Sequence, residues 1–490
     1  TADDVGVVAA TAAQRDALRD GVVGYIRGEP AHNPEQNALG KVWKLGDVFR
    51  STPITVGSPS SFYEDKRDAN NQWAAHRATH QRSSAAGNRL IVAGANDGQF
   101  HAFKTGDGKE AWSFVPPNFL TKLKLMTHSS HPTSLAHQYF VDGPVTVADV
   151  WLGTGDGRAK TADWKTMLVF GLGRGAVDYA WSSSASCDAG ISPVYSVDTP
   201  HYCGYWAFDL NDSRNPAYMW RLAPNAAQAP YVGDPWSKMM PGRVRYKEDG
   251  LEVEKWVGFV GAGYNAGNCK ASGCDLRGKG FFVVDLDDGT ILWSYTRAND
   301  LDMDFSMAAA PAIVDTDNDG FIDTVYLGDL GANMWRFTFC RGAEMPDCTV
   351  GDWGGSMFFN ASSGQIRPIY TSAAVARDSA GNLWVHWGTG DKTDPTAANA
   401  QEHFYSVKDN DRTSTWSISD IDNITQASGT YSASSGKPGY RIQFAGQGEK
   451  LLSDPTIFGG VVYFTTFTPA RSNNPCEQGG TAELYGVHHT

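Results

Sequence analysis

Short β-strand units repeat along most of this chain, and no other feature restricts its fold as strongly. Each unit opens with a short strand, often begun by proline, that follows a polar residue. Six segments fit this description: residues 52–56, 143–147, 240–244, 310–314, 372–376 and 454–458. An apolar strand, a glycine-rich turn and an aromatic strand then follow, as in Ile91–Gly94 and Phe100–Phe103. Units of about 60–100 residues with three or four short strands each are typical of β-propeller blades.

We therefore predict an all-β fold, a modified β-propeller of six or seven blades with an N-terminal helix and loop insertions. A seventh blade would combine strands from both ends of the chain. The composition agrees, because 53 glycines and 12% aromatic residues suit many short strands joined by turns. The insertions are expected at 176–204 and 262–277, which are rich in serine, glycine and cysteine. An array of ordinary β-sandwiches is the alternative.

One helix is predicted ahead of the repeats, over residues 11–27. Thr11 can cap its N-terminus, and Gly28 and Pro30 end it. Apolar side chains share one face at helical spacing: Leu18, Val22, Tyr25 and Ile26. That face is expected to pack on the outside of the following domain. We therefore divide the chain into an N-terminal linker and helix, residues 1–45, and a propeller, residues 46–490.

The acidic stretch 315–323 is the predicted metal site. Four carboxylates stand at positions 1, 3, 5 and 9 of this stretch: Asp315, Asp317, Asp319 and Asp323. A hard cation such as Ca²⁺ takes oxygen ligands at this spacing, and the carbonyl of Phe321 adds a neutral oxygen. Gly320 permits the sharp turn that the loop needs. The sequence thus predicts a calcium-binding propeller, with an affinity of about 10⁻⁶ to 10⁻³ M.

The residues around the acidic stretch argue against an EF-hand. An EF-hand places a bidentate glutamate at position 12, where this chain has Tyr326. The flanking segments 312–314 and 324–327 are β-branched and aromatic, so they are predicted to be strands. The site is therefore a strand–loop–strand hairpin. An aspartate-rich turn without a metal is the alternative, but four unpaired acids in so short a loop would repel one another.

Charge argues against two classes of partner. The chain carries 41 lysine and arginine residues and 54 aspartate and glutamate residues, a net charge of −13. Nucleic acids and anionic membrane surfaces need a basic face, so we expect neither as a partner. No apolar run approaches the ~20 residues that span a bilayer, so no transmembrane segment is expected. Thr1 is not an initiator methionine, so we expect a processed chain or part of a longer one.

Six of the seven cysteines fall into three local pairs. These pairs flank polar, loop-like segments: Cys187 with Cys203, Cys269 with Cys274, and Cys340 with Cys348. Local pairs of this kind are typical of disulfides in exported proteins. We therefore expect three disulfides and an extracytoplasmic location. Cys476 is left over, either free or paired with a cysteine outside this sequence.

No catalytic motif is visible, so no catalytic or cofactor-binding residue other than the calcium ligands is assigned. The sequence has no HExxH, no GxSxG and no P-loop, and no nucleophile stands beside a base. The dispersed histidines His201, His386 and His403 neighbour aromatic residues, which indicates a packed or surface position. Asp287 and Asp288 fall in a turn, where they are expected to be solvated. We therefore expect that the chain is not an enzyme.

Two segments resemble the blade motif of quinoprotein dehydrogenases. Residues 104–112 and 287–293 share an acidic or polar turn, a glycine and a final tryptophan, in the style of D-x-T-G-K-x-x-W. In those enzymes the tryptophan packs between blades, so the resemblance implies a structural role and a quinoprotein-like propeller. The adjacent pair of cysteines found in that family is absent here. A quinone-dependent dehydrogenase of the PQQ type therefore stays an alternative function.

Several segments in order resemble the C-terminal propeller domain of the PilY family, the type IV pilus biogenesis factors and tip-associated adhesins. The matching segments are 25–28, 45–53, 94–103, the acidic loop with 326–337, 388–391 and 476–480. The strings ANDGxxHAF and DxDxDGxxD followed by GDLxxNxWRF are specific in combination. The resemblance runs from about residue 20 to 485 and leaves out the larger N-terminal region of that family.

This resemblance implies a non-enzymatic, calcium-dependent pilus factor that opposes pilus retraction. It implies a place in the periplasm or on the outer surface at the pilus tip, the fimbrium, with roles in cell adhesion and twitching motility. The implied partners are minor pilins at the type IV pilus tip, with host surface receptors or matrix as further ones. A stand-alone surface adhesin that binds a host protein or glycan through its loops is the remaining alternative.

Overall fold

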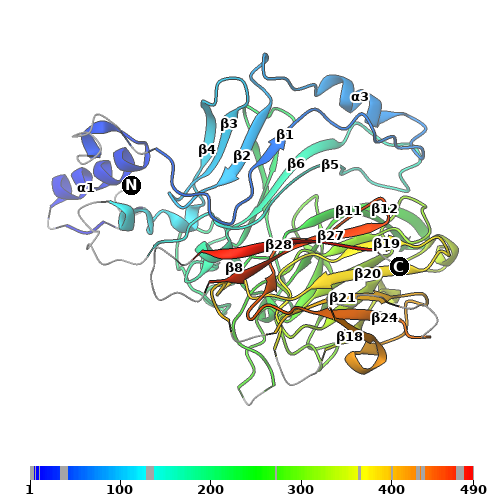
Figure 1. The fold of residues 1–490 in the computed structure, drawn as a ribbon. Coiled ribbons are helices and arrows are strands. Elements are labelled where there is room, and N and C mark those ends of the chain that lie inside the picture. The colour runs from blue at the N-terminus through cyan, green and yellow to red at the C-terminus, as the bar shows by residue number, and fades with distance from the viewer. Residues whose placement is uncertain are drawn as a thin grey trace.

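The computed structural model describes residues 5, 7–9, 11–33, 42, 44–127, 137–270, 273–361, 366–398, 401–425, 431, 436–470 and 479–488. In these residues six sheets of four or five strands follow one another along the chain, and one two-stranded ribbon joins them. Figure 1 shows the sheets gathered on one side and the N-terminal helix on the other. The β-propeller fold predicted from the sequence is confirmed.

The first three sheets hold four strands each, all antiparallel to their neighbours. The first comprises β1 (Ile54–Val56), β2 (Leu90–Gly94), β3 (Phe100–Lys104) and β4 (Glu110–Phe114). The second comprises β5 (Val145–Trp151), β6 (Trp164–Gly171), β9 (Tyr205–Asp209) and β10 (Ala217–Arg221). The third comprises β11 (Met240–Glu248), β12 (Leu251–Gly261), β13 (Gly280–Asp285) and β14 (Ile291–Thr296). The insertion at 176–204 forms the ribbon of β7 (Trp181–Ser182) and β8 (His201–Tyr202).

The last three sheets are more irregular. The fourth comprises β15 (Ala312–Val314), β16 (Thr324–Gly328), β17 (Met334–Thr338), β18 (Gly354–Asn360) and β22 (Trp416–Ser417). The fifth comprises β19 (Ala374–Arg377), β20 (Leu383–Gly388), β21 (His403–Lys408), β24 (Gly439–Gln443) and β23 (Asp422–Thr425). The sixth comprises β25 (Lys450–Leu451), β26 (Thr456–Phe458), β27 (Val461–Pro469) and β28 (Gly480–His488). The parallel pairs β18–β22 and β23–β24 add a fifth strand to the fourth and fifth sheets.

All six strands predicted from the proline-opened repeats exist, and each is the first strand of the meander in its sheet. They contact one another in chain order: β1 with β5, β5 with β11, β11 with β15, β15 with β19, and β19 with β26. Successive sheets thus pack through their first strands, as the blades of a propeller do. The segments that lead into these strands are therefore brought together from the whole length of the chain.

Tryptophans in the last strand of two sheets join those sheets to the next, and for Trp112 this is the packing that the quinoprotein-like motif implied. The indole of Trp112 in β4 donates to the carbonyl of Ser213, between β9 and β10, at 2.8 Å. The indole of Trp220 in β10 donates to the carbonyl of Leu286, after β13, at 2.8 Å. A buried indole N–H needs a partner, so these bonds hold each sheet against the next.

The N-terminal helix α1 spans Ala12–Ile26, close to its predicted bounds. Thr11 caps it, and the side chain of Gln14 completes a reciprocal capping box. Val22 is buried in the core that the first sheets share, whereas Leu18 remains 41% exposed. The helix contacts the turn η3 (Leu123–Met126), which follows the first sheet along the chain.

A second helix, α3 (Gln72–Thr79), lies in the long connection between β1 and β2 and was not predicted. It has eight residues, too few for a clear apolar period. Its buried Trp73 packs edge-on against Trp164 of β6, with ring centroids 4.7 Å apart. The tertiary contact of one large aromatic side chain, which a local pattern does not reveal, therefore accounts for this helix.

Candidate metal site

The acidic loop joins β15 and β16 in an antiparallel hairpin, as predicted from its flanks. Ala312, Ile313 and Val314 pair with Tyr326, Val325 and Thr324 in register. The loop turns sharply at two positions with positive φ, Asn318 at 58° and Gly320 at 90°. Glycine adopts this conformation at little cost, which explains the residue at position six of the loop.

Three of the predicted ligands come together. Asp315, Asp317 and Asp323 each offer one carboxylate oxygen, and these oxygens all lie within 4.8 Å of one another. Two oxygens bound to one Ca²⁺ at 2.3–2.6 Å are on the order of 5 Å apart at most, so a single ion can reach all three. An all-oxygen, anionic donor set suits a hard cation rather than zinc or copper. The residues present therefore fit calcium.

Asp323 is the buried anchor of this group, with 1% of its surface exposed. Its carboxylate accepts hydrogen bonds from the backbone N–H of Thr316 at 2.9 Å and from the Thr316 hydroxyl at 2.7 Å. The hydroxyl of Thr324 donates to the same carboxylate at 2.7 Å. These bonds fix the orientation of the carboxylate whether or not a cation is present.

Asp315 and Asp317 are held by backbone donors. The Gly320 N–H donates to Asp315 at 2.8 Å, within the loop. The Gly342 N–H donates to Asp317 at 2.8 Å, from the segment that follows β17. Burial alone would raise the pKa of Asp317, but the hydrogen bonds from Gly342 and Asp319 lower it below its ordinary value. Asp317 therefore stays ionised, as a calcium ligand must be.

Asp319 lies outside the group of three. Its carboxylate forms an ion pair with Arg245 of β11 and accepts the Phe321 N–H at 2.9 Å. Burial raises the pKa of Asp319 in spite of Arg245. The roles of Asp319 and of the Phe321 carbonyl as ligands stay predictions, and Asp319 would have to turn away from Arg245 to bind the same ion.

Arginines around the Phe321 ring offset the acids of the loop. The ring is 1% exposed, and the guanidinium groups of Arg67, Arg243 and Arg245 lie 5.0, 4.6 and 4.8 Å from its centroid. Arg243 also donates to the Gly320 carbonyl at 2.6 Å. Sequence reasoning missed this contribution. Alternate residues of a strand share a face, so Arg243 and Arg245 indicated a basic face, but not what it would contact.

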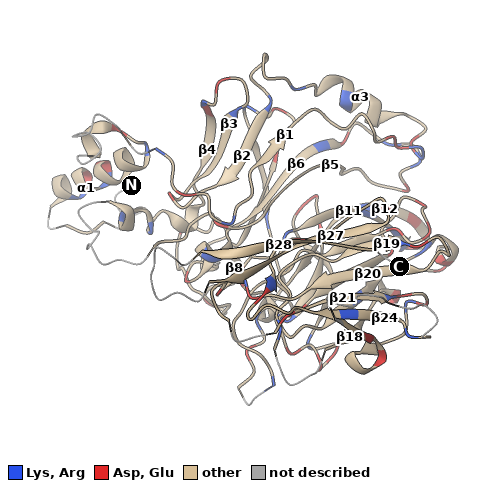
Figure 2. Cartoon of the chain, viewed as in Figure 1, with Lys and Arg blue, Asp and Glu red and all other residues tan. Residues whose placement is uncertain are grey.

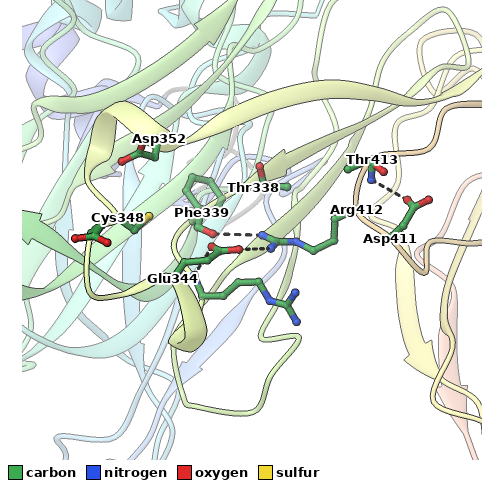
Figure 3. Close-up of a pocket in the computed structure, with 10 residues that line it drawn as sticks. Thr338, Phe339, Glu344, Cys348, Asp352, Asp411, Arg412 and Thr413 are labelled. Atoms are coloured by element: carbon green, nitrogen blue, oxygen red, sulfur yellow. Dashed lines mark hydrogen bonds and ion pairs between the residues drawn. The ribbon is translucent and has the colours of Figure 1, made fainter.

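A cavity of about 540 Å³ lies beside the hairpin, next to the Cys340–Cys348 disulfide. Figure 3 shows Glu344 and Arg412 facing each other across it, and their closest charged atoms are 3.7 Å apart. Arg412 also donates to the Asp323 carbonyl at 2.7 Å. Together with the bond from Gly342 to Asp317, this ties the metal loop to the segment after β17 and to the connection between β21 and β22.

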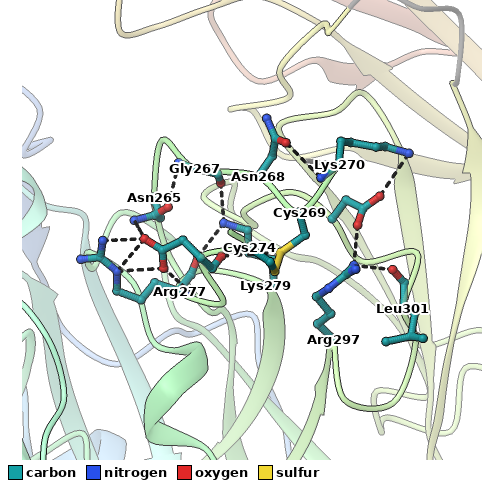
Figure 4. The surroundings of a disulfide bond; sticks show 12 residues. Asn265, Gly267, Asn268, Cys269, Lys270, Cys274, Arg277, Lys279, Arg297 and Leu301 are labelled. Carbon is teal, nitrogen blue, oxygen red and sulfur yellow. Dashed lines mark hydrogen bonds and ion pairs between the residues drawn. A yellow bond between two sulfur atoms is a disulfide. The ribbon is translucent and has the colours of Figure 1, made fainter. Parts of the chain in front are cut away.

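All three predicted disulfides are present. Their Cα–Cα distances are 5.9 Å for Cys187–Cys203, 4.3 Å for Cys269–Cys274 and 5.8 Å for Cys340–Cys348. Figure 4 shows the second of these in the 262–277 insertion, where Lys279 donates to the Arg277 carbonyl at 2.9 Å. Cys476 lies outside the described residues.

The histidines considered from the sequence are packed or partly exposed, and Asp287 and Asp288 are exposed in their turn, as predicted. His386 and His403 are buried, and His403 contacts the Tyr405 hydroxyl at 2.9 Å. Asp288 accepts a hydrogen bond from the Thr290 N–H within its turn, at 2.9 Å. Acidic and basic residues are interspersed over the sheets and loops (Figure 2). None of the helices in the described part of the chain has the length and apolar character that crossing a bilayer requires.

Comparisons with known proteins agree with this fold. Residues 247–427 match the sequence model of the PilY1 beta-propeller domain. The type IV pilus biogenesis factor PilY1 of Pseudomonas aeruginosa strain PAK is 24% identical over 525 aligned residues, covering 95% of this chain. A PilY1 homologue of Xylella fastidiosa is 28% identical over 377 residues, covering 75% of this chain.

The crystal structure of the P. aeruginosa PilY1 C-terminal domain superimposes with a TM-score of 0.61 and 20% identity. The match covers 89% of this chain and 85% of that domain. The aligned part is only 40% of the full length of the PAK protein and 25% of the X. fastidiosa one. The resemblance predicted from the sequence is confirmed: this chain contains a β-propeller domain similar to the C-terminal domain of PilY1, a type IV pilus biogenesis factor.

Proposed function

We propose that this chain is a non-enzymatic, calcium-dependent type IV pilus biogenesis factor that opposes pilus retraction. The observation that carries the proposal is the group of Asp315, Asp317 and Asp323 on a propeller similar to that of PilY1. Relatives named as pilus biogenesis factors support the pilus role. The chain spans about two fifths of the PAK protein, so the tip location, adhesion and twitching motility are part of the proposal.

Bound calcium would supply a positive charge that holds three carboxylates together and stiffens the edge of the fourth sheet. Asp315, Asp317 and Asp323 would bind it, with the Phe321 carbonyl and water completing the shell. Thr316 and Thr324 orient Asp323, and Gly342 orients Asp317. Calcium is favoured over magnesium because the loop offers flexible oxygens and magnesium gives up its waters reluctantly.

The location proposed for this chain is outside the cytoplasm, at the pilus tip or the outer surface. Three disulfides support this proposal, because disulfides persist in oxidising compartments. Minor pilins at the tip are the proposed partners, and host surface receptors or matrix are further ones.

Replacing Asp315 in the natural full-length protein tests both halves of this proposal. An Asp315→Ala strain should lose calcium binding and show fewer surface pili, while the protein is still made and folded. Asp288→Ala is the matched control, since it removes an exposed aspartate from a hairpin turn of another sheet. Normal piliation in an Asp315→Ala strain with full expression would refute the pilus half. Absence of calcium binding in calorimetry of the unaltered domain would refute the metal half.

A further inference from the structure

A second site lies where the segments leading into the first strands converge. A cavity of about 380 Å³ opens there. Each of the six sheets contributes one lining residue three or four positions ahead of the strand that begins its meander (β1, β5, β11, β15, β19 and β26): Arg50, Asp142, Trp236, Ala308, Tyr370 and Leu452. The cavity is thus placed at the centre of the propeller by the fold itself, and it is separate from the acidic loop.

Three cationic side chains line this cavity: Arg50, Arg174 and Lys392. None of the three forms an ion pair within the described part of the chain. Arg50 donates to the backbone carbonyl of Lys392 at 3.1 Å, which joins the first sheet to the fifth. Arg174 donates to the Tyr139 hydroxyl at 3.3 Å. Their contacts are therefore to neutral oxygens, and their charges remain available to an anion.

Aromatic rings hold the guanidinium groups in place. The ring of Trp236 stacks on Tyr264, with centroids 4.0 Å apart and an interplanar angle of 11°. The guanidinium carbon atoms of Arg50 and Arg174 lie 4.5 and 5.3 Å from the Trp236 ring centroid. Cation–π contacts of this kind favour one arrangement of two flexible side chains, so less ordering is needed when a ligand binds.

The charge inside the cavity is unbalanced. Asp142 is the only acid among the described lining residues, and it is 1% exposed. One of its carboxylate oxygens accepts the Arg50 N–H at 3.1 Å, and the other, Oδ2, has no hydrogen-bond partner. Burial raises the pKa of Asp142 to about 6. Burial also lowers the pKa of Arg50, and Arg174 lowers it further by repulsion.

Other acids near the cavity are engaged elsewhere. Asp454 accepts the Ser372 N–H at 2.9 Å and attracts Lys392, whose pKa is nevertheless lowered by burial, and Asp391 accepts the Thr393 N–H at 2.7 Å. Asp47 contacts the His137 ring at 2.8 Å. None of these three lines the cavity. In a chain with a net charge of −13, the centre of the propeller is therefore a local concentration of positive charge.

We propose that this cavity binds a carboxylate-bearing ligand. Arg50, Arg174 and Lys392 would bind the carboxylate groups, and the exposed parts of Trp236 and Tyr370 would cover the carbon skeleton. A carboxylate-bearing ligand is favoured over inorganic phosphate, because the rings of Trp236 and Tyr370 can cover a carbon skeleton and inorganic phosphate has none. The source is either a small free polycarboxylic acid or the acidic end of a peptide.

Calorimetry on the whole chain tests this proposal with defined probes. Citrate represents small hydroxylated polycarboxylates, and a short peptide ending in Asp-Glu with a free carboxyl terminus represents the peptide source. The amidated peptide with Asn-Gln is its neutral control, and inorganic phosphate tests the competing anion. We expect binding of citrate or of the acidic peptide that weakens as salt is raised. Binding of only one of the two identifies the source.

Variants separate a specific site from general electrostatic attraction. Arg174→Ala and Lys392→Gln should each weaken binding about tenfold or more, since each removes a charge-assisted contact. Arg214→Ala is the matched control, because it removes an exposed arginine outside the cavity and should change nothing. Asp142→Asn should tighten binding severalfold, because the amide oxygen can still accept the Arg50 N–H while the negative charge is gone.

Three results would overturn the proposal. One is the absence of binding at millimolar probe concentration by both the unaltered chain and Asp142→Asn. Another is equal binding by Arg174→Ala and Arg214→Ala when both melt at the temperature of the unaltered chain. The third is tighter binding of phosphate than of either carboxylate probe. Because Asp142→Asn is expected to gain affinity, a variant that merely fails to fold cannot imitate the predicted result.

Discussion

Replacing Asp323 with alanine should destabilise the metal hairpin even when no calcium is present, whereas replacing Asp315 with asparagine should have a much smaller effect. The Asp323 carboxylate is buried and accepts the Thr316 N–H, the Thr316 hydroxyl and the Thr324 hydroxyl. The hydroxyls can rotate toward other acceptors, but the buried N–H cannot. Asp323→Ala should therefore cost about 1–3 kcal/mol of hairpin stability in EDTA from that N–H alone.

The stability that calcium adds to the hairpin can be measured separately from this loss. If the dissociation constant is about 10⁻⁵ M, 1 mM free calcium adds ~2.7 kcal/mol to the stability of the unaltered hairpin, or about 100-fold slower local opening. Asp315→Asn keeps an oxygen that accepts the Gly320 N–H, gives up the longer bond from the Asp319 N–H at 3.2 Å, and gives up a charged ligand. It should therefore resemble the unaltered protein in EDTA and lose most of the calcium-dependent protection.

Hydrogen exchange followed by mass spectrometry measures the local stability of the hairpin directly, because it reports local opening in peptides covering residues 312–328. In EDTA these amides should exchange about 5- to 150-fold faster in Asp323→Ala than in the unaltered protein. Peptides from β13, in the third sheet, are the internal control and should not change. The reasoning is wrong if Asp323→Ala exchanges at the unaltered rate in EDTA, or if Asp315→Asn keeps the full protection by calcium.

Further predictions follow from other contacts. The pKa of His101 would be lowered by burial alone, but hydrogen bonds with Asp97 at 3.0 Å and Glu110 at 2.6 Å raise it above its ordinary value. The stability that this raised pKa contributes is fully present below about pH 6.5, the ordinary pKa of histidine. It is lost as pH rises through the pKa of His101 in the folded protein. Chemical denaturation at pH 6 and pH 9 should therefore show a larger loss for the unaltered chain than for His101→Gln, and equal losses would contradict this. Non-reducing mass spectrometry of protein from its native compartment should recover the three local disulfides, and six free thiols would refute both the pairing and the proposed location. Asp319→Lys should destabilise the hairpin in thermal melts, because the new ammonium faces Arg245; a melt unchanged from the original would show that this ion pair is unimportant. No dye-linked alcohol oxidation is expected after addition of pyrroloquinoline quinone and calcium, and turnover would favour the dehydrogenase instead.

Structural features formed by residues close together in the sequence were predictable. The hairpin at 312–328 follows from a β-branched flank, an acidic loop and a glycine at the turn, all within 17 consecutive residues. The capped helix α1 and the three disulfides are similarly local. The repeat of proline-opened strands extended this reasoning to the whole fold, because each repeated unit is expected to pack against the units before and after it.

Features that join distant segments were not predictable from one sequence. The pattern 243–245 showed two arginines on one strand face, but not that they meet Asp319 and Phe321, more than 70 residues later. The short helix α3 exists because Trp73 packs on Trp164. In each case the deciding contact joins two side chains that are far apart in the sequence, and no repeating pattern of residues connects them.

The position of the central cavity follows from the sequence repeat, but the residues that line it do not. Each segment that leads into a first strand has the same structural role, so repetition predicts that six such segments meet on the propeller axis. It does not predict their chemistry, because the residues at the equivalent positions differ: Arg50, Asp142, Trp236, Ala308, Tyr370 and Leu452. A purely structural channel needs only residues that pack, and two arginines and a lysine that form no ion pair with any described residue are costly there. Positive charge gathered at the one place where all sheets meet is therefore better explained by an anionic ligand than by the requirements of the fold.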